Sequence, residues 1–201
     1  MRAWIATAVL AVASLAGSAT VSAQGMPQAP QNPTIANTLD FQLTLVEFEF
    51  VSAAEAMPED KYSFAPTNGE FKGVRTFAQQ VKHVAALNNR FFSSLLGEAV
   101  ATGPAEGENG PDSIQTKEQI LKYLRDSFAL GHKAIATITA DNALSDVKSP
   151  PIPFFKTRLA IASFVSVHAM DHYGQMVEYL RMNGIIPPAS RPRPPAARPA
   201  A

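Results

Sequence analysis

Two histidines four residues apart are the strongest chemical signal in this sequence. His168 and His172 lie in the segment VHAMDHY, residues 167–173. On a helix this spacing places both imidazoles on one face, about 5–6 Å apart at Cβ, where one turn can supply two ligands to a metal ion. Both share an apolar face with Phe164, so we expect them to point inward, where each neutral ring needs a hydrogen-bond partner. The alternative is two partly exposed histidines that make ordinary hydrogen bonds.

Several enzyme classes that use such histidines are excluded by the neighbouring residues. The zinc-protease motif needs a glutamate directly after the first histidine, where this chain has Ala169. Di-iron bundles need a glutamate three residues before a histidine. Those positions, before the histidines at 83, 168 and 172, hold Gln80, Val165 and Ala169. A dinuclear, oxygen-activating centre is therefore not expected.

The composition narrows the chemistry further. The chain of 201 residues contains four histidines and no cysteine, which excludes disulfides, thiolate zinc sites, iron–sulfur clusters, c-type haem attachment and a cysteine nucleophile. It has 17 basic and 17 acidic side chains, so its formal net charge is zero. Because nucleic-acid surfaces need clustered Lys and Arg, a nucleic-acid partner is not expected.

The other two histidines give weaker signals. His83 lies between the core positions Val81 and Val84, at the edge of an apolar stripe, and by itself indicates a structural or exposed side chain. His132 follows Gly131, and we expect it to be exposed, with no assigned chemistry.

Four proline-free tracts predict the elements that position these side chains. They span residues 34–56, 74–101, 116–141 and 154–183, and a proline inside a helix would cost about 3 kcal/mol. Each tract has apolar residues at three- and four-residue steps, as one face of a helix requires. The stripes include Leu39, Leu43, Val46, Phe50, Phe77, Val81, Val84, Asn88, Phe91, Ile120, Leu124, Phe128, Ile135, Ile138, Ile161, Val165 and Met176.

The pattern predicts an all-α protein, a four-helix bundle with long connections between its helices. Thr116 and Gln119 have the spacing of a capping box at the start of the third helix. The connections near 57–73, 102–115 and 142–153 are longer than a tight turn requires. They permit crossovers, so their length leaves the topology open.

Both ends of the chain are expected to lie outside this bundle. Residues 1–23 predict a secretory signal peptide, with Arg2, an apolar run and small residues before a cleavage site after Ala23. The run is short for about 30 Å of hydrocarbon, so cleavage is favoured over an N-terminal anchor. We therefore expect a periplasmic or secreted protein with no membrane span after cleavage. Residues 24–33 predict a flexible lead-in, 34–188 the bundle, and 189–201 a disordered tail of Pro, Ala and Arg.

Three segments of the chain resemble the DinB-like superfamily, small metal-binding four-helix bundles unrelated to the DNA polymerase of that name. The first is HAMDHYGQ at 168–175, followed by YLR at 179–181, NG at 183–184 and PP at 187–188. Residues 56–64, AMPEDKYSF, resemble the family's segment after its first helix. Residues 77–84, FAQQVKHV, resemble its second helix, which has the first metal ligand.

The resemblance implies a site for one divalent metal ion made by His83, His168 and His172. Three neutral imidazoles leave coordination positions open for water or substrate, as in catalytic sites. Zinc, nickel and manganese all accept imidazole, so the ligand type does not choose among them. Asp171 and Gln175, the latter in the family's H-x-G-Q pattern, are expected either to orient the ligands or to make surface hydrogen bonds only.

The resemblance also implies two kinds of function. Some relatives are similar to low-molecular-weight thiol transferases, where the metal would bind the thiolate of a cosubstrate. Since this chain has no cysteine, the thiol would come from a small molecule, and export would separate the protein from cytoplasmic thiols. A metal-dependent hydrolase is the neighbouring hypothesis, with Asp171 as the only acidic residue beside the histidine pair in sequence. The alternative is a non-enzymatic metal-binding or stress-related module, which predicts bound metal, no turnover and a homodimer formed through a helix face. A haem bundle would leave the three matching histidines unexplained.

Overall fold

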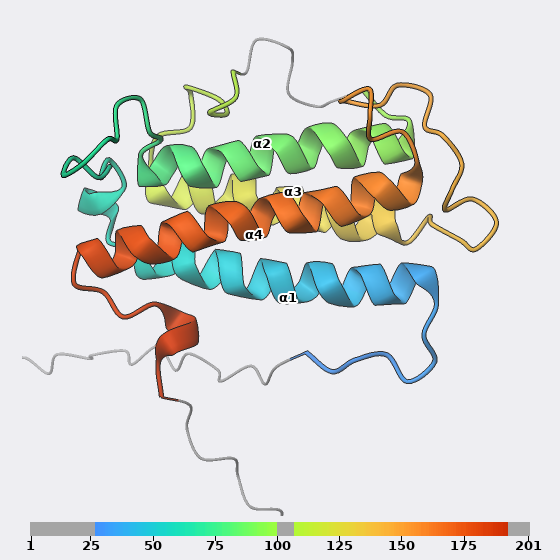
Figure 1. Cartoon of the computed structure of the whole chain (residues 1–201), viewed down its shortest axis with the longest axis horizontal. Coiled ribbons are helices and arrows are strands. Elements are labelled where there is room, and N and C mark those ends of the chain that lie inside the picture. The colour runs from blue at the N-terminus through green and yellow to red at the C-terminus, as the bar shows by residue number, and fades with distance from the viewer. Residues whose placement is uncertain (1–26, 100–106, 193–201) are drawn as a thin grey trace, which may run out of the picture.

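The computed structural model describes residues 27–99 and 107–192 and shows four long helices side by side (Figure 1). Single 3-10 turns, η1 and η2, follow the first and last helices. The elements are α1 (Ile35–Ala56), η1 (Glu59–Lys61), α2 (Phe77–Leu96), α3 (Lys117–Ile135), α4 (Arg158–Met182) and η2 (Pro188–Ser190). The described residues form no strand beyond an isolated bridge between Asp146 and Thr157. The all-α four-helix bundle expected from the sequence is confirmed.

A threonine is the N-cap residue of each of the four long helices. Each accepts a hydrogen bond from the backbone N–H three residues later, which satisfies a donor that the first turn leaves unpaired. These capping residues are Thr34, Thr76, Thr116 and Thr157. At the first three, the side chain of the third helical residue completes a capping box, including the predicted pair Thr116 and Gln119.

The third helix ends earlier than the apolar pattern predicted. α3 stops at Ile135 rather than near residue 141. The Asn142 side chain accepts from the N–H of Thr139 (2.8 Å) and donates to the C=O of Thr137 (3.0 Å). These bonds satisfy backbone groups that a continuing helix would have used. Ile138 is nevertheless buried, so this position of the stripe still packs into the core.

The packing order places helices that are distant in sequence next to each other. α2 packs against α3 and α4, and α1 packs against the same two helices, so α1 and α2 lie diagonally across the bundle. In Figure 1, α1 and α4 run in one direction and α2 and α3 in the other. Because α2 and α3 are parallel neighbours, the connection between them returns along the whole bundle. The sequence had left this crossover open.

The predicted stripes form one hydrophobic core. Nearly all of their residues are buried, and the largest fully buried side chains include Phe50, Phe77, Phe91, Phe92 and Phe128. Among the described residues, no helix has both the length and the hydropathy to cross a bilayer. The predicted signal peptide and most of the predicted tail fall outside the described residues, so those expectations remain predictions.

Candidate metal centre

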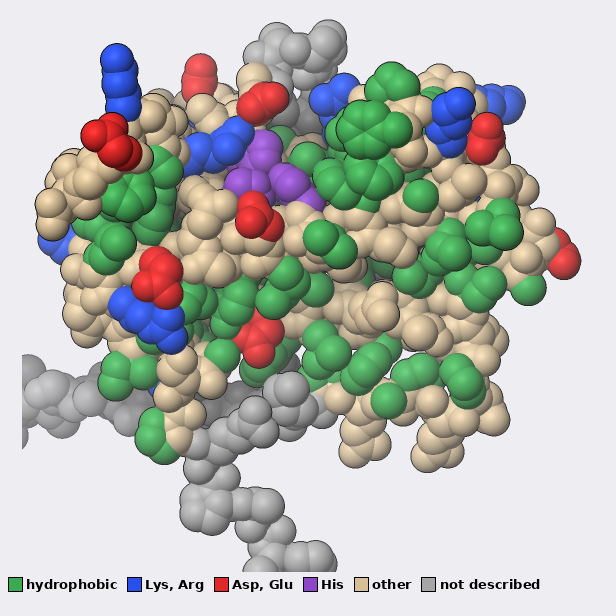
Figure 2. Space-filling view, viewed as in Figure 1, with side chains coloured by type: hydrophobic (Ala, Val, Ile, Leu, Met, Phe, Trp, Pro, Cys, Tyr) green, Lys and Arg blue, Asp and Glu red, His purple; other side chains and the backbone are tan. Residues whose placement is uncertain are grey.

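Three histidines from two helices meet in one place. His83 is near the start of α2, while His168 and His172 lie one turn apart on α4. The Nε2 atom of His168 is 3.1 Å from Nε2 of His83 and 3.2 Å from Nε2 of His172. Figure 2 shows the histidines together in a hollow at the surface of this face. The structure thus brings together the three side chains that the resemblance named.

The donor set fits a divalent metal ion. The three histidines each offer one nitrogen, and all three nitrogens lie within 4.8 Å of one another. Two imidazole nitrogens bound to one ion at about 2.0–2.1 Å would lie about 2.8–3.4 Å apart for angles between a right angle and the tetrahedral one. Both measured Nε2–Nε2 distances fall in that range. The group could therefore hold a metal ion.

A chain of side-chain hydrogen bonds orients His172. Its Nδ1 is 2.5 Å from Oε1 of Gln80. The Gln80 amide in turn donates through Nε2 to Oε1 of Gln175 (2.8 Å). The Gln175 amide donates through Nε2 to Oδ2 of Asp171 (3.2 Å). An ionised carboxylate only accepts, so Asp171 fixes the orientation of both amides. The proton of His172 must then be on Nδ1, which leaves a lone pair on Nε2 facing the other histidines. Gln175 and Asp171 are thus connected to His172 through Gln80.

The segment before α3 orients His83. Nδ1 of His83 contacts the backbone carbonyl of Glu108, an acceptor, so this ring also has its proton on Nδ1 and its lone pair on Nε2. Arg75 holds the segment from one side, donating to Oδ1 of Asn109 (2.8 Å) and to the Glu108 carboxylate (3.1 Å). The buried Lys82 holds it from the other, donating through Nζ to the carbonyls of Pro111 (2.9 Å) and Ile114 (3.3 Å).

His168 differs from its two neighbours. Its Nδ1 is buried and has no hydrogen-bond partner within the part of the chain that the structure describes. Its Nε2 faces two lone pairs, so a proton there is shared between His83 and His172 when no metal is bound. A metal ion would take the place of that proton, and the neutral ring would then have its proton on Nδ1. The ring of His168 also packs against the ring of Phe164, with centroids 5.7 Å apart.

All three rings are neutral at pH 7. Burial, together with the nearby His172 and His83 rings, lowers the pKa of His168 to about 3. Burial and the ring of His83 lower the pKa of His172 to about 4. Burial also lowers the pKa of His83, although its contact with the Glu108 carbonyl opposes this. Neutral imidazole is the form that binds metals, so little proton release would accompany binding.

The fourth histidine is not the exposed bystander that the sequence suggested. His132 is partly buried, with 30% of its side chain exposed, and lies between two carboxylates of α1. Its Nδ1 is 2.6 Å from Oδ1 of Asp40 and its Nε2 is 3.0 Å from Oε2 of Glu47. The hydrogen bond to Glu47, with that to Asp40, raises the pKa of His132 to about 9 against the opposing effect of burial. His132 is therefore a cationic brace between α3 and α1, away from the other histidines.

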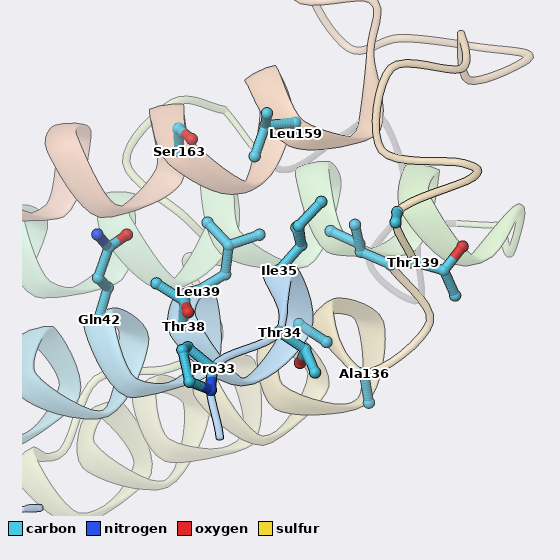
Figure 3. A pocket seen from close by; sticks show the side chains of 13 residues that line it. Pro33, Thr34, Ile35, Thr38, Leu39, Gln42, Ala136, Thr139, Leu159 and Ser163 are labelled. Atoms are coloured by element: carbon cyan, nitrogen blue, oxygen red, sulfur yellow. The ribbon is translucent and has the colours of Figure 1, made fainter. Parts of the chain in front are cut away.

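A mainly apolar groove lies apart from the histidines. It has a volume of about 1000 Å³ and lies between the starts of α1 and α4, with Ile35, Leu39 and Leu159 among its lining residues (Figure 3). It is mainly apolar and contains no titratable side chain. With α4 rising about 1.5 Å per residue, its last lining residue, Ser163, is about 7.5 Å along the helix from His168, the nearest of the three histidines. The groove offers no group for catalysis.

The sequence interpretation missed the groups that hold the ligands. In the sequence, Gln80 occupies a position where a di-iron protein would have glutamate, and a polar residue about one turn before His83 on a helix is the signal that could have identified it. No local sequence pattern indicates the contacts of Arg75, Lys82 and Glu108, because these contacts depend on how the segment before α3 lies against α2.

The fold and the histidine group together define an all-α bundle with a candidate metal centre between two of its helices. A family model, that of the DinB superfamily, matches residues 42–176. This match covers more than half of the chain, and the protein belongs to the DinB superfamily. No curated protein matches the chain.

Proposed function

We propose that this protein is an exported metalloenzyme that binds one divalent ion through His83, His168 and His172 and transfers a small thiol to a small-molecule acceptor. The observation that supports this most directly is the convergence of the three histidines, with the Nε2 atom of His168 at metal-ligand spacing from the Nε2 atoms of both His83 and His172. A three-imidazole set leaves coordination positions for a substrate, as catalytic rather than closed structural sites do.

The surroundings of the histidines favour thiol transfer over hydrolysis. A divalent ion held there would lower the pKa of a bound thiol or water. Among the described residues no carboxylate hydrogen-bonds to these three histidines, and Asp171 is exposed and bonded to Gln175. A hydrolase would need a general base to handle the protons of its attacking water. A thiol that has lost its proton needs no such base.

The chain's own residues have positioning tasks in this proposal. Gln80 and the Glu108 carbonyl hold the protons of His172 and His83 on Nδ1, which keeps each Nε2 available as a ligand. The segment held by Lys82 and Arg75 covers His83 and limits the approach of water from that side.

Metal analysis of matched histidine variants tests the metal site. Wild-type protein should contain about one divalent ion per chain, and His83→Ala should lose it under the same dialysis, because two ligands from one helix bind weakly. The control is His132→Ala, which removes the histidine outside the group and should keep the ion. Full occupancy in His83→Ala would refute the three-histidine site.

Turnover assays separate the enzyme from the alternative, a non-enzymatic metal-binding module. A panel of small thiols with electrophilic acceptors, and a panel of esters, should be assayed with and without chelator. We expect thiol consumption that stops on chelation and returns with metal. Metal-loaded protein with no chelator-sensitive turnover on either panel would favour the binding module.

The proposed export rests on residues 1–23 and is tested separately. Cell fractionation and intact mass should find a chain that begins at Gln24 outside the cytoplasm. A chain that keeps Met1 in the cytoplasm would contradict export without affecting the metal site.

A further inference from the structure

A series of aromatic rings runs from the core to the surface beside His168. Phe91 is buried, and its ring centroid lies 5.1 Å from that of Phe164. Phe155 stacks on Phe164 at 4.2 Å with an interplanar angle of 27°, and Phe154 follows at 4.9 Å from Phe155. We call Phe154, Phe155 and Phe164 the phenylalanine shelf.

The shelf is unusual because it places aromatic surface in water. Phe154 is 75% exposed, and Phe155 and Phe164 are only partly buried. Single exposed apolar side chains are common and need no explanation. Here, however, each ring of the shelf contacts the next, and the innermost of the three, Phe164, lies against the ring of His168 with centroids 5.7 Å apart.

The shelf borders the histidines on the side where they are open. His172 is closed from behind by Gln80, and His83 is covered by the segment that includes Glu108. Figure 2 shows the histidines at the surface, with a group of hydrophobic side chains directly beside them and charged side chains on the other side. A molecule that reaches the Nε2 atoms across this face therefore meets aromatic surface next to its metal-binding atom.

We propose that the phenylalanine shelf is a substrate subsite for a flat apolar group, preferably an aromatic ring, attached within a few bonds of the atom that the metal holds. This inference rests on the proposed function, because it assigns the substrate class of the same site. Stacking against Phe164 and Phe155 would both remove the ring from water and orient the bound atom. The substrate class is thus a small thiol or acceptor with an aromatic group, rather than a purely polar one.

Cobalt-loaded protein gives a direct binding test. Co²⁺ bound to three histidines has visible absorption that changes when a thiolate binds, so dissociation constants can be measured without turnover. The probes are benzyl mercaptan and ethanethiol, which share the donor atom and differ in the ring. We expect benzyl mercaptan to bind about tenfold more tightly, the size of one good aromatic contact.

The variants assign this preference to the shelf. Phe155→Ala and Phe164→Leu should reduce the ratio of the two dissociation constants to about twofold, with ethanethiol binding and the Co²⁺ spectrum unchanged as the check on folding. Phe155 precedes α4 in the connection, so its truncation leaves the four helices intact. The control is Leu144→Ala, since Leu144 is also 75% exposed and is outside the ring series; it should keep the wild-type ratio.

Each failure has a different meaning. If wild-type protein does not bind Co²⁺, the proposed metal site is wrong and the subsite is wrong with it. If Co²⁺ binds but the two thiols have equal affinity, or the preference survives both Phe155→Ala and Phe164→Leu, the subsite alone is overturned.

Discussion

The hydrogen bond between Gln80 and His172 gives the sharpest test of how this centre is built. Gln80 is 1% exposed and its Oε1 is 2.5 Å from Nδ1 of His172. Gln80→Leu keeps a side chain of similar size but removes the acceptor. The Nδ1–H of His172 is then buried without a partner, and the ring is no longer held with Nε2 towards the other histidines.

The expected loss follows from that geometry. Removing a partner that orients a metal-binding histidine typically costs about 10–100-fold in metal affinity, or about 1.4–2.8 kcal/mol. Gln80→Leu should therefore raise the metal dissociation constant by this factor. Competition with a chromophoric chelator measures it, and denaturant unfolding of the metal-free protein measures folding stability independently.

The matched control is another buried amide on the same helix. Asn88 is fully buried on α2 and donates to Oγ of Ser127 (3.2 Å) rather than to a histidine. Asn88→Leu should change folding stability but alter metal affinity by less than about twofold, since distant sites act independently. Equal metal affinities in Gln80→Leu and wild type, or equal losses in the two variants, would refute the assigned role of Gln80.

Three further predictions concern the scaffold. Folding raises the pKa of His132 from 6.5 to about 9, so its contribution to stability is complete below the unfolded value and is lost as the pH rises through 9. After allowance for solvent screening, the free energy of unfolding of wild type should exceed that of His132→Gln by about 1 kcal/mol near pH 6 and by almost nothing near pH 10. Denaturant unfolding measures this difference, and a difference that does not change with pH would contradict the prediction. Gly131→Ala should destabilise by about 1–3 kcal/mol, because its Cβ would lie 2.6 Å from a ring carbon of Phe92. The control is Gly174→Ala on α4, where an added Cβ has no neighbouring atom within 4 Å. This change should stabilise the protein by about 0.5–1 kcal/mol. Melting temperatures that shift in the same direction for both variants would contradict the prediction. Lys82→Met should accelerate hydrogen exchange in residues 107–115, because two backbone carbonyls lose their donor; wild-type exchange rates there would show that Lys82 does not hold the segment.

Much of the bundle followed from local patterns in the sequence. Proline positions bounded the four helices, and apolar steps of three and four residues selected the buried faces, so residues such as Phe50 and Phe128 were placed in the core correctly. The capping box at Thr116 was also predictable, because it involves residues three apart. The predicted end of α3 was wrong because the Asn142 side chain forms hydrogen bonds with backbone groups that a longer helix would use. Apolar periodicity contains no information on such side-chain bonds.

Gly131 shows, at a single residue, the difference between what a local pattern predicts and what the packing of the helices decides. In the sequence it was only a weak helix former in the middle of a stripe. In the structure its missing side chain lets the core side chains Phe92 and Leu43 approach α3 closely. The apolar pattern cannot predict this, since it contains no information on how near two helices come.

By itself, the sequence determined that His168 and His172 share a helix face, because 3.6 residues per turn fix that relation locally. It did not determine that His83 meets them, that Gln80 and the Glu108 carbonyl set their protons, or that the phenylalanine shelf lies beside them. Those relations depend on the rotation, direction and relative shift of α2 and α4. These variables are decided only when all four apolar faces pack into one core, so only the tertiary structure could settle them.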